Sequence, residues 1–139
     1  MKLYVTRHGE TAWNRENIVC GVTDIPLNET GMEQAKATAQ KLRDTPLDRV
    51  RVSPLLRARQ TAALICEGAS RFDEGFLNNK KSFAVRYPGG ESQMSTAVRV
   101  YTFLEETARA FPEESVLVVC HGGICRIIES YFHNMTNQE

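Results

Sequence analysis

The segment Val116-Leu117-Val118-Val119-Cys120-His121-Gly122-Gly123 is an unbroken apolar run that ends in a histidine and two glycines. A short apolar run of this kind is typical of a strand that is buried on both faces of a parallel sheet. We therefore expect a strand over Val116–Cys120, buried on both faces of a sheet, and a helix over Ile124–Tyr131. The polar residues between them would lie at the carboxyl end of the strand.

Two further strand candidates lie upstream, and helical patterns separate them. Lys2–Thr6 and Val50–Val52 are short and rich in β-branched residues. Helical periodicity recurs over three segments, 32–43, 55–66 and 92–111. The last of these has an apolar stripe that includes Val98 and Leu104. Residues 67–91 contain several glycines and no sustained periodicity, so we expect them to be mostly irregular.

Alternating strands and helices indicate an α/β protein. The chain has 139 residues, 42% of them hydrophobic, which is enough to bury the core of one domain over residues 1–139. We expect a single-domain layered fold with a mostly parallel sheet and helices on both faces.

Charge and composition exclude several classes of function. Seventeen Lys and Arg residues balance seventeen Asp and Glu residues, so no overall positive charge favours a nucleic-acid partner or an anionic membrane. No stretch of about 20 apolar residues is present to span a bilayer. Without a leader-like segment at Met1, the sequence predicts a cytoplasmic protein. It does not indicate an oligomeric state.

The four cysteines do not form a typical metal site. Cys120-His121 and Cys125 are close in sequence, but a second pair of ligands is missing. We therefore interpret Cys20, Cys66, Cys120 and Cys125 as reduced thiols, and we predict no bound metal.

Charged and polar residues follow all three predicted strands. The strands end at Arg7-His8-Gly9, at Ser53-Pro54 with Arg57 just beyond, and at His121-Gly122-Gly123. Ligands of open α/β sheets bind outside the carboxyl ends of the strands. Arg57 and Arg59 are two residues apart on a helix, so at most one of them can face such a site. The sequence thus predicts two histidines and two arginines at one edge of one sheet.

This group of residues suits phosphoryl transfer. A neutral imidazole can attack phosphorus and hold the phosphoryl group through a labile P–N bond. Guanidinium groups stay charged and bind phosphate oxygens in pairs. The glycines after each histidine allow close approach of the backbone, and the N-terminus of the last helix favours an anion.

Several segments now resemble one family. Leu3 to Asn14, with Arg7-His8-Gly9-Glu10-Thr11 at its centre, resembles the opening signature of the histidine phosphatase superfamily, the phosphoglycerate mutase-like proteins. Its later motifs are matched by Cys20-Gly21 with Asp24 to Leu27, by Ser53 to Ala62, by Tyr87 to Ser92 and by Val116 to Gly123. The resemblance covers about four-fifths of the chain.

The resemblance implies specific roles. His8 would be the phosphorylated nucleophile, and Arg7, Arg57 and His121 would bind the phosphoryl oxygens. Four further residues would assist in binding the substrate, namely Asn14, Cys20, Gly21 and Gly122. The resemblance also implies a small phosphorylated substrate and no metal or organic cofactor.

The sequence departs from the family pattern at two places. Relatives carry a third strand and a Leu-x-Glu element before the segment at Tyr87, and the glutamate of that element is the general acid. This chain has no Leu-x-Glu there, so about 15 to 20 residues are missing near 66–67. The C-terminal strand of relatives is missing as well. The general acid is therefore unknown, with Glu67 as a candidate and Asp73 and Glu74 as alternatives, although each is more typical of an exposed loop.

Three functions are consistent with these features. The leading interpretation is a phosphatase that hydrolyses small phosphate monoesters through a phosphohistidine. A phosphoglycerate mutase-type phosphotransferase needs the same chemistry but also insertions that exclude water, for which 139 residues leave little room. A catalytically inactive module that binds a phosphorylated ligand is the third. The substrate is not evident, and residues 68–88 would select it.

Overall fold

The structure is a computed structural model, and it describes residues 1–67 and 92–133. Its strands are β1 (Lys2–Arg7), β2 (Arg49–Val52) and β3 (Ser115–Cys120). Its helices are α1 (Ala12–Arg15), α2 (Glu29–Lys41), α3 (Leu56–Glu67), α4 (Gln93–Ala110) and α5 (Gly122–Phe132).

The three strands form one parallel sheet in the order β1-β3-β2. Lys2 pairs with Ser115 and Arg7 with Cys120 along one side of β3, and Arg49 to Val52 pair with Val116 to Val119 along the other. All six residues of β3 are buried, as its apolar sequence predicts. Within the described residues every strand pairing is parallel, which confirms the expected sheet type.

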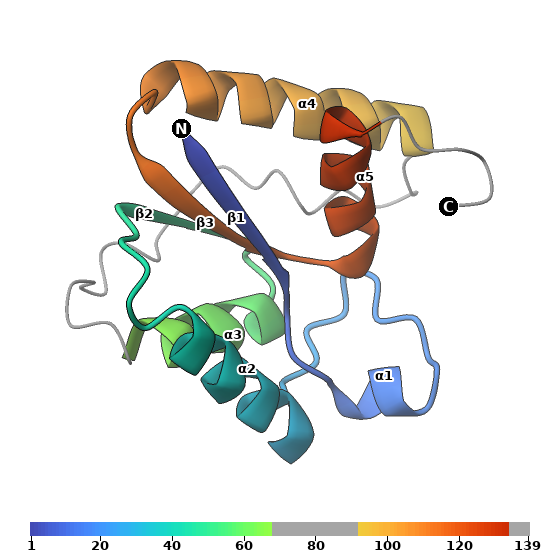
Figure 1. The fold of residues 1–139 in the computed structure, drawn as a ribbon. Helices are drawn as coiled ribbons and strands as arrows, with labels where there is room; N and C mark the ends of the chain where they lie inside the picture. The colour runs from blue at the N-terminus through green and yellow to red at the C-terminus, as the bar shows by residue number, and fades with distance from the viewer. Residues whose placement is uncertain (68–91, 134–139) are drawn as a thin grey trace.

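Helices cover both faces of the sheet (Figure 1). α2 and α3 lie on one side, and α4 and α5 lie on the other. Leu117 and Val119 of β3 pack with Ala58 and Ala62 of α3, whereas the alternate residues of β3 face the other side. Those residues are Val116, Val118 and Cys120, and they pack with Val100, Leu104, Ile124 and Ile128 of α4 and α5. This arrangement confirms the predicted layered α/β fold.

Backbone hydrogen bonds extend the sheet just beyond its carboxyl edge. The N–H of His8 donates to the carbonyl of Cys120 at 2.9 Å, and the N–H of Ser53 donates to the carbonyl of Val119 at 3.0 Å. His121 follows β3 directly and is the N-cap of α5. The sheet therefore fixes His8, Ser53 and His121 side by side.

The apolar stripe of α4 differs from the prediction. Val98, which was predicted to belong to the apolar stripe, is 61% exposed, whereas Val100 is fully buried. Leu104 is buried as expected. Val100 and Leu104 lie four residues apart and therefore on one face of the helix, against the sheet.

Most predicted elements are present with small shifts at their ends. α5 begins at Gly122, two residues earlier than expected, and the short helix α1 was not predicted. Glu67 is the last residue of α3 rather than the first of an irregular segment. The rest of that segment, with Asp73 and Glu74, lies outside the described residues, as does the chain after His133. The predicted missing segment near 66–67 and the missing C-terminal strand therefore stay predictions.

Candidate active site

A hollow of about 840 Å³ opens at the carboxyl edge of the sheet. Its lining includes all eight residues predicted to bind or transfer a phosphoryl group: Arg7, His8, Asn14, Cys20, Gly21, Arg57, His121 and Gly122. Glu67 does not line the hollow. It is exposed at the far end of α3, about 15 Å along the helix axis from Arg57.

Two hydrogen bonds fix the tautomer of His8. The carbonyl of Gly9 lies 2.7 Å from Nδ1 and can only accept, so Nδ1 carries the proton. Nε of Arg57 lies 3.3 Å from Nε2 and can only donate, so Nε2 presents its lone pair. Both contacts require the same neutral ring, with Nε2 as the basic and nucleophilic atom.

The surroundings of His8 favour this neutral form. The residue is 7% exposed, and its burial lowers the pKa of the imidazole from 6.5 to about 4, although the hydrogen bond to Gly9 opposes the shift. The positive charges of Arg57 and Arg7 make smaller contributions to this lowering of the pKa. A neutral nucleophile is therefore available at neutral pH without a base to deprotonate it.

His121 lies against His8, with ring centroids 5.2 Å apart and an edge-to-face angle of 60°. Its Nε2 is 2.7 Å from the hydroxyl oxygen of Ser53, and its Nδ1 is buried without a partner among the described residues. Burial lowers the pKa of His121 to about 3, with smaller contributions from Arg57, His8 and Arg7. His121 is thus a second neutral imidazole, held by a side chain at the end of β2.

Arg57 is 3% exposed and is held by backbone carbonyls. Its two terminal nitrogens donate to the carbonyls of Thr23 at 2.9 Å and Gly21 at 2.8 Å. A carboxylate oxygen of Asp24 accepts a hydrogen bond from the N–H of Leu56, the first residue of α3, at 2.6 Å. The segment around Gly21 therefore fixes both the start of α3 and the guanidinium that it carries. Arg59 is exposed, as the spacing of the two arginines predicts.

Arg7 and the first turn of α5 are in close contact. A Cβ added to Gly122 would lie 3.4 Å from Cζ of Arg7. The guanidinium and the N-terminal N–H groups of α5 therefore border the same part of the hollow, and both favour an anion.

Asn14 and Cys20 belong to a compact turn after β1. Thr11 and Asn14 form a reciprocal capping box around α1, with both bonds at 3.1 Å. The side-chain nitrogen of Asn14 donates to Sγ of Cys20 at 3.6 Å. The turn brings both predicted substrate-binding side chains to the rim of the hollow.

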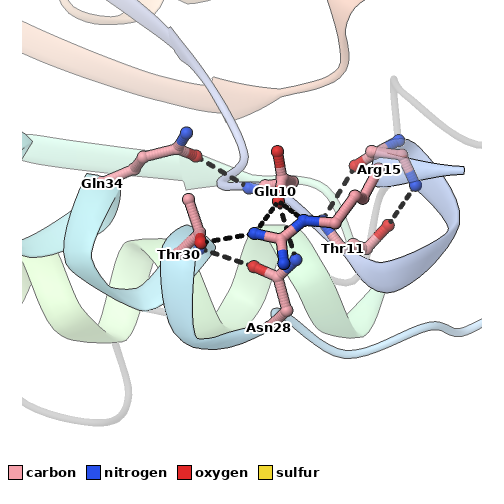
Figure 2. Close-up of polar contacts among 8 residues, drawn as sticks. Glu10, Thr11, Arg15, Asn28, Thr30 and Gln34 are labelled. Carbon is pink, nitrogen blue, oxygen red and sulfur yellow. Dashed lines mark hydrogen bonds and ion pairs between the residues drawn. The ribbon is translucent and has the colours of Figure 1, made fainter. Parts of the chain in front are cut away.

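A polar network ties this turn to the start of α2 (Figure 2). The carboxylate of Glu10 accepts from Nε of Arg15 at 3.0 Å and from the amide of Asn28 at 2.9 Å. Arg15 also donates to the hydroxyl of Thr30 at 2.7 Å, and the Gln34 side chain accepts from the N–H of Glu10 at 2.9 Å. The network holds the backbone that follows His8.

The same backbone touches α2 at two glycines. A Cβ on Gly9 would lie 2.3 Å from the carbonyl oxygen of Gly31, and a Cβ on Gly31 would lie 2.1 Å from that of Glu10. Neither distance leaves room for a methyl group. The close approach explains why glycine is needed at these two positions.

We expect Gly31→Ala to destabilise the protein by about 1–3 kcal/mol, because backbone atoms must move to admit the methyl group. Urea denaturation measures the change. Gly123→Ala is the matched control, since Gly123 is also helical but has nothing within 4 Å of an added Cβ. Equal stability of the two variants would contradict the contact.

The buried histidines predict a pH dependence of stability. Between pH 6.5 and about 4 the unfolded chain protonates His8, whereas the folded protein keeps it neutral. The unfolded state binds more protons in this window, so the free energy of unfolding should fall as the pH falls, by about 3 kcal/mol at most for this group. Denaturation of wild type and His8→Asn at several pH values measures the contribution.

His133→Asn is the control for this experiment because His133 is exposed at the end of α5. Relative to wild type, His8→Asn should flatten part of the slope of stability against pH. A wild-type slope in His8→Asn would show that His8 is protonated as readily in the folded protein as in the unfolded chain.

The sequence did not assign roles to several residues of the site. Ser53 contacts His121, and the hydroxyl of Thr61 accepts from the N–H of Gly9 at 3.0 Å while it donates to the carbonyl of Arg57 at 2.8 Å. Arg126 is an exposed cation that lines the hollow. Two signals in the sequence could have found them: Ser53 follows the second predicted strand at its carboxyl end, and Arg126 lies one turn after His121-Gly122.

In residues 1–67 and 92–133, no three His, Cys, Asp or Glu side chains are grouped as metal ligands. Over the same ranges, no helix is both long and apolar enough to cross a membrane.

The family model of the histidine phosphatase superfamily (branch 1) matches residues 3–76 and 69–139 of this chain. The chain belongs to the histidine phosphatase superfamily. This result confirms the resemblance that the motifs indicated.

Individual relatives of this histidine phosphatase-like chain include phosphatases and mutases. It is 33% identical over 135 residues to uncharacterized phosphatase PhoE of Bacillus subtilis, and this alignment covers 85% of this chain and 70% of the relative. It is 30% identical over 171 residues to a 2,3-bisphosphoglycerate-dependent phosphoglycerate mutase of Methylobacterium, with 98% and 82% covered. The structure of YhfR from Bacillus stearothermophilus aligns with a TM-score of 0.79 and 25% identity, over 96% of this chain and 80% of that one.

Proposed function

We propose that the protein hydrolyses small phosphate monoesters through a phosphohistidine on His8. The observation that carries this proposal is the orientation of the His8 ring, whose Nδ1 is held by the Gly9 carbonyl while Nε2 presents its lone pair beside Arg57. Membership of a superfamily that contains phosphatases supports it.

The proposed reaction has two steps. Nε2 of His8 attacks phosphorus, the bond from phosphorus to the ester oxygen breaks, and the alcohol leaves after taking up a proton. A water molecule then attacks phosphorus and releases a proton, the P–N bond breaks, and inorganic phosphate leaves with His8 restored. Nδ1 keeps its proton and donates it in a hydrogen bond to the Gly9 carbonyl throughout, which keeps Nε2 in its reactive form.

Positive charge would stabilise both transition states. The transferred phosphoryl group spreads negative charge over three equatorial oxygens. Arg57 and Arg7 both line the hollow, and the first N–H groups of α5 border the same space. In this proposal Asn14, Cys20 and the backbone of Gly21 bound the site, and no step needs a metal or organic cofactor.

The general acid is the unassigned part of the reaction. Glu67 lies at the wrong end of α3, so we do not give it this role. Without a positioned acid, the rate on alkyl phosphates should fall by about 10²–10⁴-fold, because an alkoxide is a poor leaving group. Aryl phosphates should suffer far less, since a phenolate leaves readily.

We therefore expect the protein to hydrolyse p-nitrophenyl phosphate much faster than an alkyl phosphate such as glycerol phosphate. The kcat/KM ratio of the two substrates is the measurement. Arg126→Ala leaves the nucleophile His8 and the cations Arg7 and Arg57 in place, so it is a control in which the ratio should stay high. Equal rates on the two substrates would show that a general acid is present.

A mutase is the second candidate, because the chain is 30% identical to a phosphoglycerate mutase over most of both proteins. Incubation with 3-phosphoglycerate and catalytic 2,3-bisphosphoglycerate separates the two activities. Release of inorganic phosphate supports the phosphatase, whereas formation of 2-phosphoglycerate without phosphate release supports the mutase. Formation of the phosphohistidine without any turnover would indicate the inactive binding module.

A further inference from the structure

Two thiols face each other at the junction of β3 and α5. Sγ of Cys120 and Sγ of Cys125 are 3.5 Å apart and share a hydrogen bond. Cys120 is the last residue of β3, and Cys125 lies in the first turn of α5, where its N–H donates to the carbonyl of His121 at 2.9 Å. A disulfide has an S–S distance of about 2.05 Å, so the two sulfurs must approach each other by about 1.5 Å to form one.

One of the two thiols is accessible from outside the active site. Cys120 is fully buried, but Cys125 is only partly buried. Cys125 lines a second hollow of about 550 Å³, together with Leu3 and Val5 of β1 and Ile128 of α5. This hollow shares no lining residue with the candidate active site. A small oxidant can therefore reach Cys125 without passing His8.

The two thiols differ in acidity. The hydrogen bond from Cys120 is the main cause that lowers the pKa of Cys125, and the charge of Arg7 lowers it further, although burial opposes both. The same hydrogen bond and burial raise the pKa of Cys120. Cys125 is therefore the thiol that ionises first and reacts first, since the thiolate is the nucleophile.

We propose that Cys120 and Cys125 form an oxidisable pair and that their disulfide lowers the activity of the neighbouring site. The thiolate of Cys125 attacks hydrogen peroxide, the O–O bond breaks, and a sulfenic acid and hydroxide form. The sulfur of Cys120 then attacks the sulfur of Cys125, the S–O bond breaks, and water leaves as Cys120 loses its proton. Two thiols and one peroxide thus give one disulfide and two waters.

The disulfide would act on the residues enclosed between the two cysteines. His121 and Gly122 lie within this short loop, His121 contacts Ser53, and Gly122 is packed against Arg7. Drawing the sulfurs together must shift the start of α5 relative to β3. A misplacement of about 1 Å in such a site can cost 10²-fold in rate, and we expect a loss of at least tenfold. This consequence rests on the proposed function, whereas formation of the disulfide does not.

The experiment treats the full chain with hydrogen peroxide and follows both the disulfide and the activity. Trypsin cuts after Arg109 and Arg126, so both cysteines fall in the single peptide 110–126. Without reduction, this peptide should become lighter by two hydrogens and resist alkylation. Hydrolysis of p-nitrophenyl phosphate should fall at least about tenfold in parallel and recover with dithiothreitol.

Cys125→Ser should keep its activity under the same treatment. The matched control Cys66→Ser should lose activity as wild type does, because Cys66 is buried in the core on the other face of the sheet, between β3 and α3. Two free thiols in peptide 110–126 after activity is lost would overturn the proposal and point to Cys20. A formed disulfide with full activity would overturn the inhibition. If the reduced protein shows no phosphatase activity, the proposed function fails. The mass of peptide 110–126 still tests whether the disulfide forms, and calorimetric binding of inorganic phosphate before and after oxidation still tests whether the disulfide disturbs the site.

Discussion

Replacement of His8 by alanine should reduce phosphate release by at least ~10³-fold, because the variant lacks the nitrogen that would form the covalent intermediate. The phosphoryl-protein should disappear as well. A brief reaction with p-nitrophenyl phosphate, stopped with alkali because the P–N bond is acid-labile, followed by intact-mass analysis, measures it directly. The sheet should survive the change, since His8 lies beyond the end of β1 and the backbone bond from its N–H to Cys120 does not use the ring.

His133→Ala is the matched control for this substitution, because His133 is a histidine at the end of α5 outside the candidate active site. It should keep the wild-type rate. Circular dichroism and thermal melting of both variants separate a loss of chemistry from a loss of fold. If folded His8→Ala still acquires a phosphoryl group, another residue is the nucleophile. His121 is then the first candidate, because its imidazole lies against His8.

Arg57→Lys should lower kcat by about 10²-fold, the cost of losing one preorganised donor to a developing anion. The guanidinium of Arg57 makes three directed contacts at once, to the carbonyls of Gly21 and Thr23 and to Nε2 of His8. A lysine ammonium is a single point charge and cannot hold two backbone carbonyls while it also faces the imidazole. Steady-state kinetics with p-nitrophenyl phosphate measures the loss.

Arg59→Lys tests whether this effect belongs to the site. Arg59 lies on the same helix but is exposed and does not line the hollow. Its replacement should leave kcat and KM unchanged. An unchanged kcat in Arg57→Lys would show that charge alone, without the directed contacts, is sufficient at this position.

The strands and their polar ends were predictable because each depends on a local pattern. The apolar run of Val116–Cys120 must be buried on both faces, and a parallel sheet then brings the residues after each strand to one edge. His8, Arg57 and His121 line one hollow for this reason. The prediction needed no knowledge of which strand lies in the middle.

Other features depend on contacts that a local pattern does not contain. Val98 and Val100 are both apolar, and only packing against β3 selects Val100 as the buried residue. The last helix was predicted to begin after Gly123, whereas α5 already begins at Gly122. Thr61 could not be recognised at all, because its partner Gly9 is 52 residues away in the sequence.

The strand order β1-β3-β2 also constrains how the protein folds during its synthesis. During synthesis β1 and β2 leave the ribosome long before β3, and neither of them pairs with the other. The contact between Ser53 and His121 can form only after His121, 68 residues later in the sequence, has been synthesised. Closing loops of this length makes parallel pairing slow. Until then β1 and β2 expose strand edges that can pair with other chains, so a nascent chain stalled before residue 115 is the species most at risk of aggregation.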